Sequence, residues 1–260
     1  MNKLLLLFLS TVSLAVVVSG CGTSSSPTAT LPPSTVPPLL PTTTRVPTAP
    51  PMDLPDLLAR LHWLGHASFR LDGPPVIYFD PAVSLKDAPP QADIILIGHS
   101  HNDHYFPVTL KRISKPETVI ITTHLVATLA QADGIPGQVR ALRPGERTTV
   151  GAAEIQTVPA YNISKSWHPK ASENLGFIVM LYGRRIYFAG DTDLIPEMAD
   201  IRADVALLPM GGTYTMDVQE AAQAAAILKP KAVVPMHTLG ANLEQFRGLC
   251  NCEVLVMKEE

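Results

Sequence analysis

Short apolar runs alternate with polar segments along the chain from residue 60 onward. Short runs that are bounded by Gly, Pro or Asp are typical of buried strands, and longer segments with helical spacing are typical of helices. The pattern predicts strands over 61–64, 68–71, 76–79, 94–98, 119–122, 139–142, 148–150, 154–158, 175–181, 185–189, 205–208, 232–234 and 253–257. It predicts helices over 108–114, 124–132, 217–228 and 243–249.

The order of these elements is similar in the two halves of the folded part. Residues 60–145 and 148–257 each begin with strands and then alternate strands with helices, although the halves share no repeat at the level of single residues. This order predicts an α/β (α+β) fold with two sheets packed face to face and helices outside.

The first 21 residues have the pattern of a secretory signal. A start that contains Lys3 precedes an apolar stretch from Leu4 to Val18, which is short for a membrane span of about 20 residues. The segment Val18–Cys21 resembles the bacterial lipobox, which implies cleavage before Cys21 and attachment of diacylglycerol and acyl chains such as palmitate to it. An ordinary signal peptide and an uncleaved anchor are the alternatives.

Ser, Thr and Pro dominate residues 22–54, which contain few charges and almost no aromatic residues. Such a segment cannot bury enough apolar area to fold, and its prolines keep it extended. We therefore expect a tether over 22–54 and a folded domain over 55–260. Together with lipidated Cys21, the tether predicts a bacterial lipoprotein held at a membrane outside the cytoplasm.

Composition narrows the class of partner. The chain has 260 residues, a net charge of −3 and 17% charged residues, and we find no basic run, so we expect no nucleic-acid partner. Cys250 and Cys252 are separated by a single residue, which makes a tight ring, and in a strand both would face the same way. We expect free buried thiols there; a strained or intermolecular bridge is the alternative.

Candidate chemistry is concentrated where the apolar run Ile94–Gly98 ends. Three histidines and an aspartate follow within six residues: His99, His101, Asp103 and His104. His99 and His101 point the same way in extended backbone, and Asp103 continues that period of two. Imidazole and carboxylate are ligands of zinc, iron and manganese, so this segment can serve two adjacent metal positions.

Two further polar segments also follow predicted strands. Asp191 and Asp193 come after the strand over 185–189, and His237 comes after the strand over 232–234. Ligands in layered α/β proteins gather at such strand ends. Two metal sites need about seven or eight ligand atoms, so one carboxylate must bridge, and Asp191 is suited to that role.

These motifs resemble the metallo-β-lactamase superfamily over about residues 60–257. The matching segments are His99-x-His101-x-Asp103-His104, Gly190-Asp191-Thr192-Asp193, Pro235-Met236-His237, Trp63–Phe69 and Phe79–Pro81. They look like the branch of ascorbate-phosphate lactonases and N-acyl-phosphatidylethanolamine phospholipase D. The resemblance implies a four-layer αββα sandwich with the site at one edge of the two sheets.

The resemblance also implies two metal ions, zinc above all, with manganese or iron as alternatives. His99 and His101 would hold the first ion, Asp103, His104 and His237 the second, and Asp191 would bridge. The chain departs from the family at Tyr161, where a histidine of the first site is expected. We expect His168 to replace it; otherwise the first site lacks one protein ligand or only one ion binds firmly.

Other polar residues have open roles. His66 and Asp193 either support the site or have structural roles, and Asp80 either bonds a ligand imidazole or caps a turn. Tyr161, Trp167 and Tyr214 lie in loops that border a pocket or are packed. We expect His62 on a strand surface and His124 at a helix start, neither as a ligand.

The function expected from these residues is hydrolysis by a metal-bound hydroxide, with Asp103 and His104 as catalytic residues. A phosphodiester, ester or lactone bond in a small molecule or lipid headgroup is the expected target. Fold does not select among these bonds. The alternatives are a non-catalytic metal- or ligand-binding lipoprotein and a member that has lost its activity, the latter suggested by Tyr161.

Overall fold

The computed structural model describes residues 51–85 and 88–260. The predicted signal peptide, Cys21 and the tether as far as residue 50 lie outside the described residues. Within the described ranges, no helix is long and apolar enough to cross a membrane.

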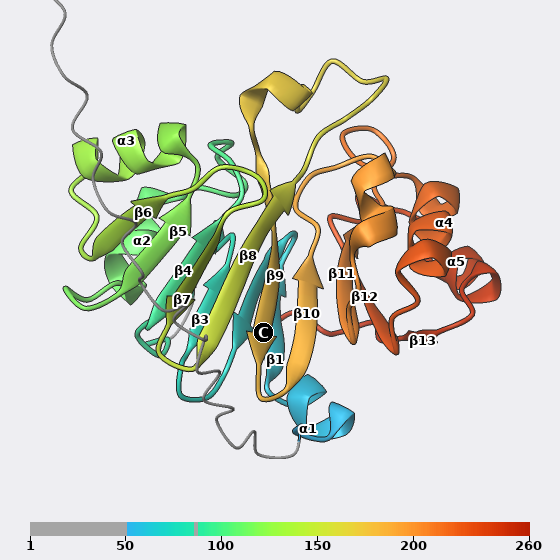
Figure 1. The fold of residues 1–260 in the computed structure, drawn as a ribbon, viewed down its shortest axis with the longest axis horizontal. Helices are drawn as coiled ribbons and strands as arrows, with labels where there is room; N and C mark the ends of the chain where they lie inside the picture. The colour runs from blue at the N-terminus through green and yellow to red at the C-terminus, as the bar shows by residue number, and fades with distance from the viewer. Residues whose placement is uncertain (1–50, 86–87) are drawn as a thin grey trace, which may run out of the picture. The chain divides into compact units, whose positions relative to one another are not determined.

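Two sheets form the centre of the domain (Figure 1). The first sheet follows chain order: β1 (Leu61–Gly65), β2 (Ser68–Leu71), β3 (Ile77–Phe79), β4 (Ile94–Ile97), β5 (Val119–Thr122) and β6 (Gln138–Ala141). The second, in spatial order, is β13 (Glu253–Val254), β12 (Ala232–Met236), β11 (Val205–Pro209), β10 (Arg184–Phe188), β9 (Leu175–Leu181), β8 (Ala153–Pro159) and β7 (Arg147–Val150).

Helices cover the outer face of each sheet (Figure 1). On the first sheet lie α2 (Pro107–Ile113) and α3 (His124–Ala132), whose buried side chains Leu110 and Val126 join Tyr78 and Ile95 in one apolar cluster. On the second sheet lie α4 (Val218–Leu228) and α5 (Leu243–Leu249). The predicted αββα sandwich is confirmed.

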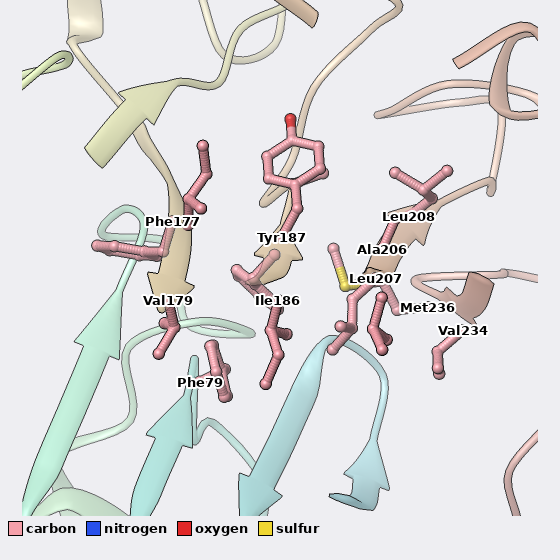
Figure 2. Close-up of a cluster of buried hydrophobic side chains, with 14 of the residues drawn as sticks. Phe79, Phe177, Val179, Ile186, Tyr187, Ala206, Leu207, Leu208, Val234 and Met236 are labelled. Atoms are coloured by element: carbon pink, nitrogen blue, oxygen red, sulfur yellow. The ribbon is translucent and has the colours of Figure 1, made fainter. Parts of the chain in front are cut away.

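The main core lies between the two sheets (Figure 2). Phe79 of β3 packs against Phe188 of β10, with ring centroids 5.4 Å apart, and Figure 2 shows it beside Val179 and Ile186. Tyr187 points away from the first sheet, as the alternation of a strand requires. Alternating positions of this kind fix the register of each strand, because a slip of one residue would turn the side chains of the inter-sheet core toward the helices.

Local sequence signals explain several element boundaries. β9 and β10 are joined by Tyr182 and Gly183, both with positive φ (54° and 71°), as a two-residue hairpin turn of the primed type requires. α4 begins after Asp217, which forms a capping box with Glu220. The last predicted strand is shorter than expected, because β13 pairs with β12 only over Glu253 and Val254.

The folded part begins before residue 55, so the predicted tether boundary is placed too late. Met52 N donates to Tyr182 O at 2.9 Å, and a short helix, α1 (Leu54–Leu58), buries Leu57 in the core. Its five residues are too few to show helical periodicity in the sequence. Two short 3₁₀ helices, η1 (Lys170–Ser172) and η2 (Pro196–Asp200), were also missed.

The expectation of free buried thiols is wrong. Cys250 and Cys252 form a disulfide, with Cα atoms 5.3 Å apart, and both side chains are only partly buried. α5 ends at Leu249 and β13 begins at Glu253, so the intervening residues bend and do not form a strand. The two Cβ atoms therefore face each other, which extended backbone would have prevented.

Candidate metal centre

The loops that follow β4, β10 and β12 bring the predicted ligands together at one edge of the sandwich. His99, His101, Asp103 and His104 follow β4, Asp191 follows β10, and His237 follows β12 directly. His168 comes from the long loop between β8 and β9. These are the seven predicted metal ligands, and the structure places all of them in one cluster.

His99, His101 and His168 form the first group. His101 Nδ1 lies 3.1 Å from His99 Nε2 and 3.1 Å from His168 Nε2. Nitrogen ligands about 2.0–2.1 Å from a tetrahedral zinc ion are separated by roughly 3.3 Å. The spacing of these three nitrogen atoms therefore fits one shared ion.

Asp103, His104 and His237 form the second group. Asp103 Oδ2 lies 3.8 Å from His104 Nε2 and 3.8 Å from His237 Nε2. His66 adjoins this group, with Nε2 3.1 Å from Asp103 Oδ2 and its ring 4.0 Å from that of His237. The backbone carbonyl of His66 also accepts from His237 N at 3.2 Å, so His66 supports two members of the group.

One oxygen atom of Asp191 lies between the two groups. Its Oδ2 is 3.3 Å from His104 Nε2 and 3.3 Å from His237 Nε2 in the second group. It is also 3.5 Å from His168 Nε2 and 4.0 Å from His99 Nε2 in the first. A single carboxylate thus faces both groups of imidazoles, as a bridging ligand must.

A hydrogen bond to Asp80 orients the imidazole ring of His104. His104 Nδ1 donates to Asp80 Oδ2 at 2.6 Å, and the other Asp80 oxygen accepts from Gly98 N at 2.7 Å. Both side chains are fully buried. With its proton on Nδ1, His104 presents the Nε2 lone pair to the cluster, which is the usual arrangement of a carboxylate, a histidine and a metal.

The charges of the cluster are strongly coupled. Burial opposes the charged carboxylate of Asp191, but His104 and His237 outweigh it and hold the pKa of Asp191 well below its usual value. Burial, together with neighbouring imidazoles, lowers the pKa of His99. Burial also opposes a charged His104, but Asp191 and Asp80 raise the pKa of His104 well above the usual histidine value. A metal at His104 would therefore displace a proton.

Three buried polar atoms of the cluster residues have no hydrogen-bond partner among the described residues. They are His104 Nε2, Asp191 Oδ1 and His237 Nδ1. Buried polar atoms without a partner destabilise a protein unless a bonded group such as an ion satisfies them. The donor set, its spacing and the unpartnered His104 Nε2 and Asp191 Oδ1 all fit bound metal.

A hydrogen-bond network holds the loop that carries His168. Tyr214 O accepts from Asn162 Nδ2 at 2.8 Å and lies 3.2 Å from His168 Nδ1. Asn162 N donates to His168 O at 2.9 Å, which closes the loop on itself. The supporting role of Asn162 was missed, because no periodicity or motif in the sequence marks it.

Asp193 fixes the same loop without touching the histidines. Its Oδ2 accepts from Ile163 N at 2.9 Å, and its Oδ1 accepts from Lys165 Nζ. Asp193 therefore supports the site indirectly, through the backbone that leads to His168.

The side chain of Tyr161 points away from the cluster, which corrects its assignment as a candidate next to the metal ligands. Tyr161 Oη donates to Glu197 Oε2 at 2.9 Å, and Lys170 Nζ lies 4.6 Å from the ring centroid. Only its backbone reaches the site loop, where Tyr161 O accepts from Asp193 N at 2.9 Å. The phenol ring fills part of the core instead.

The remaining histidines lie outside the cluster. His62, on β1, lies 3.0 Å from Asp72 Oδ2 and also contacts Glu260. His124 is the first residue of α3 and is exposed.

A cleft of about 340 Å³ opens beside both groups. Its walls combine ligands of both groups with two aromatic residues, Trp167 and Tyr214. A cleft of this size admits a small molecule or part of a larger one.

Comparison with known proteins identifies similar chains. A family model described as the beta-lactamase superfamily domain matches residues 60–237. A UPF0173 metal-dependent hydrolase of Methanoculleus marisnigri is 36% identical over 203 residues, which cover 72% of this chain and 87% of that protein.

Two solved structures are also similar. A metal-dependent hydrolase from Parabacteroides distasonis has a TM-score of 0.69 and 31% identity, over 77% of this chain and 93% of that one. A metallo hydrolase from Ignicoccus hospitalis has a TM-score of 0.63 and 27% identity, over 76% of this chain and 94% of that one.

Proposed function

Since this chain belongs to the UPF0173 family of metal-dependent hydrolases in the beta-lactamase superfamily, we propose that its hydrolytic site holds two metal ions. Each of the two groups would hold one ion, and Asp191 would be the ligand shared by both. The proposed ligands are His99, His101 and His168 for the first ion, and Asp103, His104 and His237 for the second.

The position of Asp191 Oδ2 carries this proposal. One buried oxygen atom lies 3.3–3.5 Å from His104, His237 and His168, which belong to different groups. A site for a single ion would need only one of the two groups. Imidazole nitrogen and carboxylate oxygen favour zinc, and the same donors accept manganese or iron.

Bound metal of this kind lowers the pKa of water to about 7 and polarises a carbonyl or phosphoryl oxygen. The residues of the chain then hold and orient the reactants. Partial burial raises the pKa of Asp103, but His66 and His104 outweigh it and hold that pKa far below the usual value. Asp103 is therefore a weak base, and we assign it to accept a hydrogen bond from the attacking water and so orient it.

Loss of Asp103 tests the proposal. We expect Asp103→Ala to bind fewer metal ions and to lose at least about 100-fold in kcat/KM, because one substitution removes a ligand and the orienting group. Metal content by mass spectrometry and hydrolysis of ester and phosphodiester substrates are measured on the same samples. Asp200→Ala, an exposed aspartate away from the cleft, is the matched control. Full metal content and full turnover in Asp103→Ala would refute the assignment.

We further propose that the enzyme is a lipoprotein anchored through Cys21 outside the cytoplasm. The lipobox-like segment Val18–Cys21 and the Ser/Thr/Pro-rich segment after it support this. Wild-type protein expressed in bacteria should take up labelled palmitate and begin at Cys21, and Cys21→Ala should take up no label. Equal labelling of the two proteins would contradict anchoring through Cys21.

A further inference from the structure

In the part of the chain that the structure describes, the cleft beside the metal cluster is lined by histidines, carboxylates and aromatic residues and by no Lys or Arg. A second hollow of about 180 Å³ adjoins it and shares His101 and His168 as walls. Among the residues that the structure describes, no Lys or Arg lines either hollow. Sites that recognise phosphate or carboxylate groups usually supply such cations, Arg above all. At this cleft, positive charge beyond the histidines would come only from the proposed metal ions, so no side chain is placed to bind an anionic group beyond their reach.

The two lysines of the nearby loop are engaged elsewhere. Lys165 Nζ bonds to Asp193 and lies 3.8 Å from Glu220 Oε2. Lys170 Nζ bonds to Glu197 Oε1 at 2.8 Å. The loop therefore carries positive charge, but its carboxylate partners hold that charge away from the cleft.

An aromatic pair forms the wall of the cleft instead. The rings of Trp167 and Tyr214 pack edge to face with centroids 5.2 Å apart. Trp167 lies 6.3 Å from the ring of His101, and Tyr214 lies 6.4 Å from the ring of His237. The pair thus runs alongside both metal-ligand groups, from the first to the second.

Both aromatic side chains are exposed yet held in place. Trp167 is 48% and Tyr214 36% exposed, which leaves apolar ring surface uncovered. The backbone of Tyr214 is fixed by Asn162 and His168, and Trp167 precedes His168 directly. Rings that are exposed and preorganised at a site can bury apolar ligand surface at low entropic cost. Leu125, 60% exposed, adds apolar surface to the adjoining hollow.

We infer that the substrate is an uncharged carboxylic ester or lactone whose apolar group packs against Trp167 and Tyr214. This inference rests on the proposed function and selects one class from the bonds considered there. Hydrolysis adds the oxygen of water to the carbonyl carbon and breaks the bond from that carbon to the alkoxy oxygen. The alkoxy oxygen takes up a proton and becomes the alcohol, and the other product is the carboxylic acid.

Paired substrates test the inference. Purified, metal-loaded enzyme is assayed with 4-nitrophenyl hexanoate, 4-nitrophenyl acetate and bis(4-nitrophenyl) phosphate. We expect kcat/KM for the hexanoate to exceed that for the acetate by at least about tenfold, because the longer chain buries more apolar surface. We also expect the KM for the anionic diester to exceed that for the hexanoate.

Substitutions in the aromatic pair test whether these two rings bind the apolar chain of the substrate. Trp167→Ala and Tyr214→Ala should each raise the KM for the hexanoate by about fivefold or more, with metal content unchanged and the KM for the acetate little changed. Ile163→Ala, 62% exposed in the same loop and outside the lining of both hollows, is the control and should match wild type.

Different results would overturn the substrate class and the proposed hydrolytic function. A lower KM for the diester than for the hexanoate, or unchanged hexanoate KM in both aromatic variants, would overturn the substrate class and leave the hydrolase intact. Failure of the metal-loaded enzyme to hydrolyse any of the three would overturn the proposed function as well.

Discussion

A series of contacts between Asp80, His104 and Asp191 orients the ligand atoms of the metal site. Each interaction in the series sets the next one: Asp80 fixes the proton on His104 Nδ1, and His104 Nε2 then lies 3.3 Å from Asp191 Oδ2. All three side chains are buried, so their charges are poorly screened by solvent.

Asp80→Asn tests the first contact of this series. The amide oxygen can keep the bond from Gly98 N, but the amide nitrogen then faces His104 Nδ1 as a donor and favours the proton on Nε2. We expect metal affinity to fall by about 10- to 100-fold, as measured by competition with a chelator. Asp93→Asn is the control, because Asp93 precedes β4 and the metal ligands follow that strand. Equal affinity in wild type and Asp80→Asn would show that Asp80 does not position His104.

The sequence predicted the ligand residues better than their supports. His99, His101, Asp103 and His104 are adjacent in the chain, so a strand followed by a loop necessarily places them together. Asn162 and the direction of the Tyr161 side chain depend on contacts between distant loops, such as Asn162 with Tyr214 O. No local pattern encodes such contacts.

Among the elements, β10, β11 and β12 owe part of their alignment to Asp204. Its carboxylate accepts from Arg185 N at 3.0 Å and from Lys231 Nζ at 2.8 Å, and Arg184 Nη1 lies 3.3 Å away. Partial burial raises the pKa of Asp204, but these partners outweigh it and lower the pKa.

A lowered pKa predicts a dependence of stability on pH. The ionised carboxylate of Asp204 stabilises the fold above the pKa of an unfolded aspartate, about 3.9, and this contribution is lost as pH falls through the lower folded pKa. We expect Asp204→Asn to reduce the free energy of unfolding by about 1–2 kcal/mol at pH 7, measured by urea denaturation. The difference from wild type should shrink at acid pH; a constant difference would exclude the carboxylate charge as its cause.

The sequence failed to predict the short or bent segments of the fold. Long apolar runs such as 175–181 gave strands with the expected bounds, because both faces of a buried strand are apolar. α1 and the bend between Cys250 and Cys252 are fixed by packing against the rest of the fold, and too few residues are involved to form a pattern.

In the whole molecule, the residues that stabilise the fold and the residues of the metal site lie in different places. The core between the sheets holds the strands, and the loops after β4, β10 and β12 carry the ligands at one edge. The αββα architecture followed from the order of elements and the family resemblance. The depth and lining of the cleft did not, because they arise where loops from both halves of the chain meet.

We propose that two metal ions share Asp191 and that His168 takes the position left open by Tyr161. The most direct measurement is the metal content per chain of purified wild type and His168→Ala, with Ile163→Ala as the control in the same loop. We expect two ions in wild type and in the control, and about one in His168→Ala, because the first group keeps only His99, His101 and the shared carboxylate. Two ions in His168→Ala, or none in wild type after zinc or manganese is supplied, would contradict it.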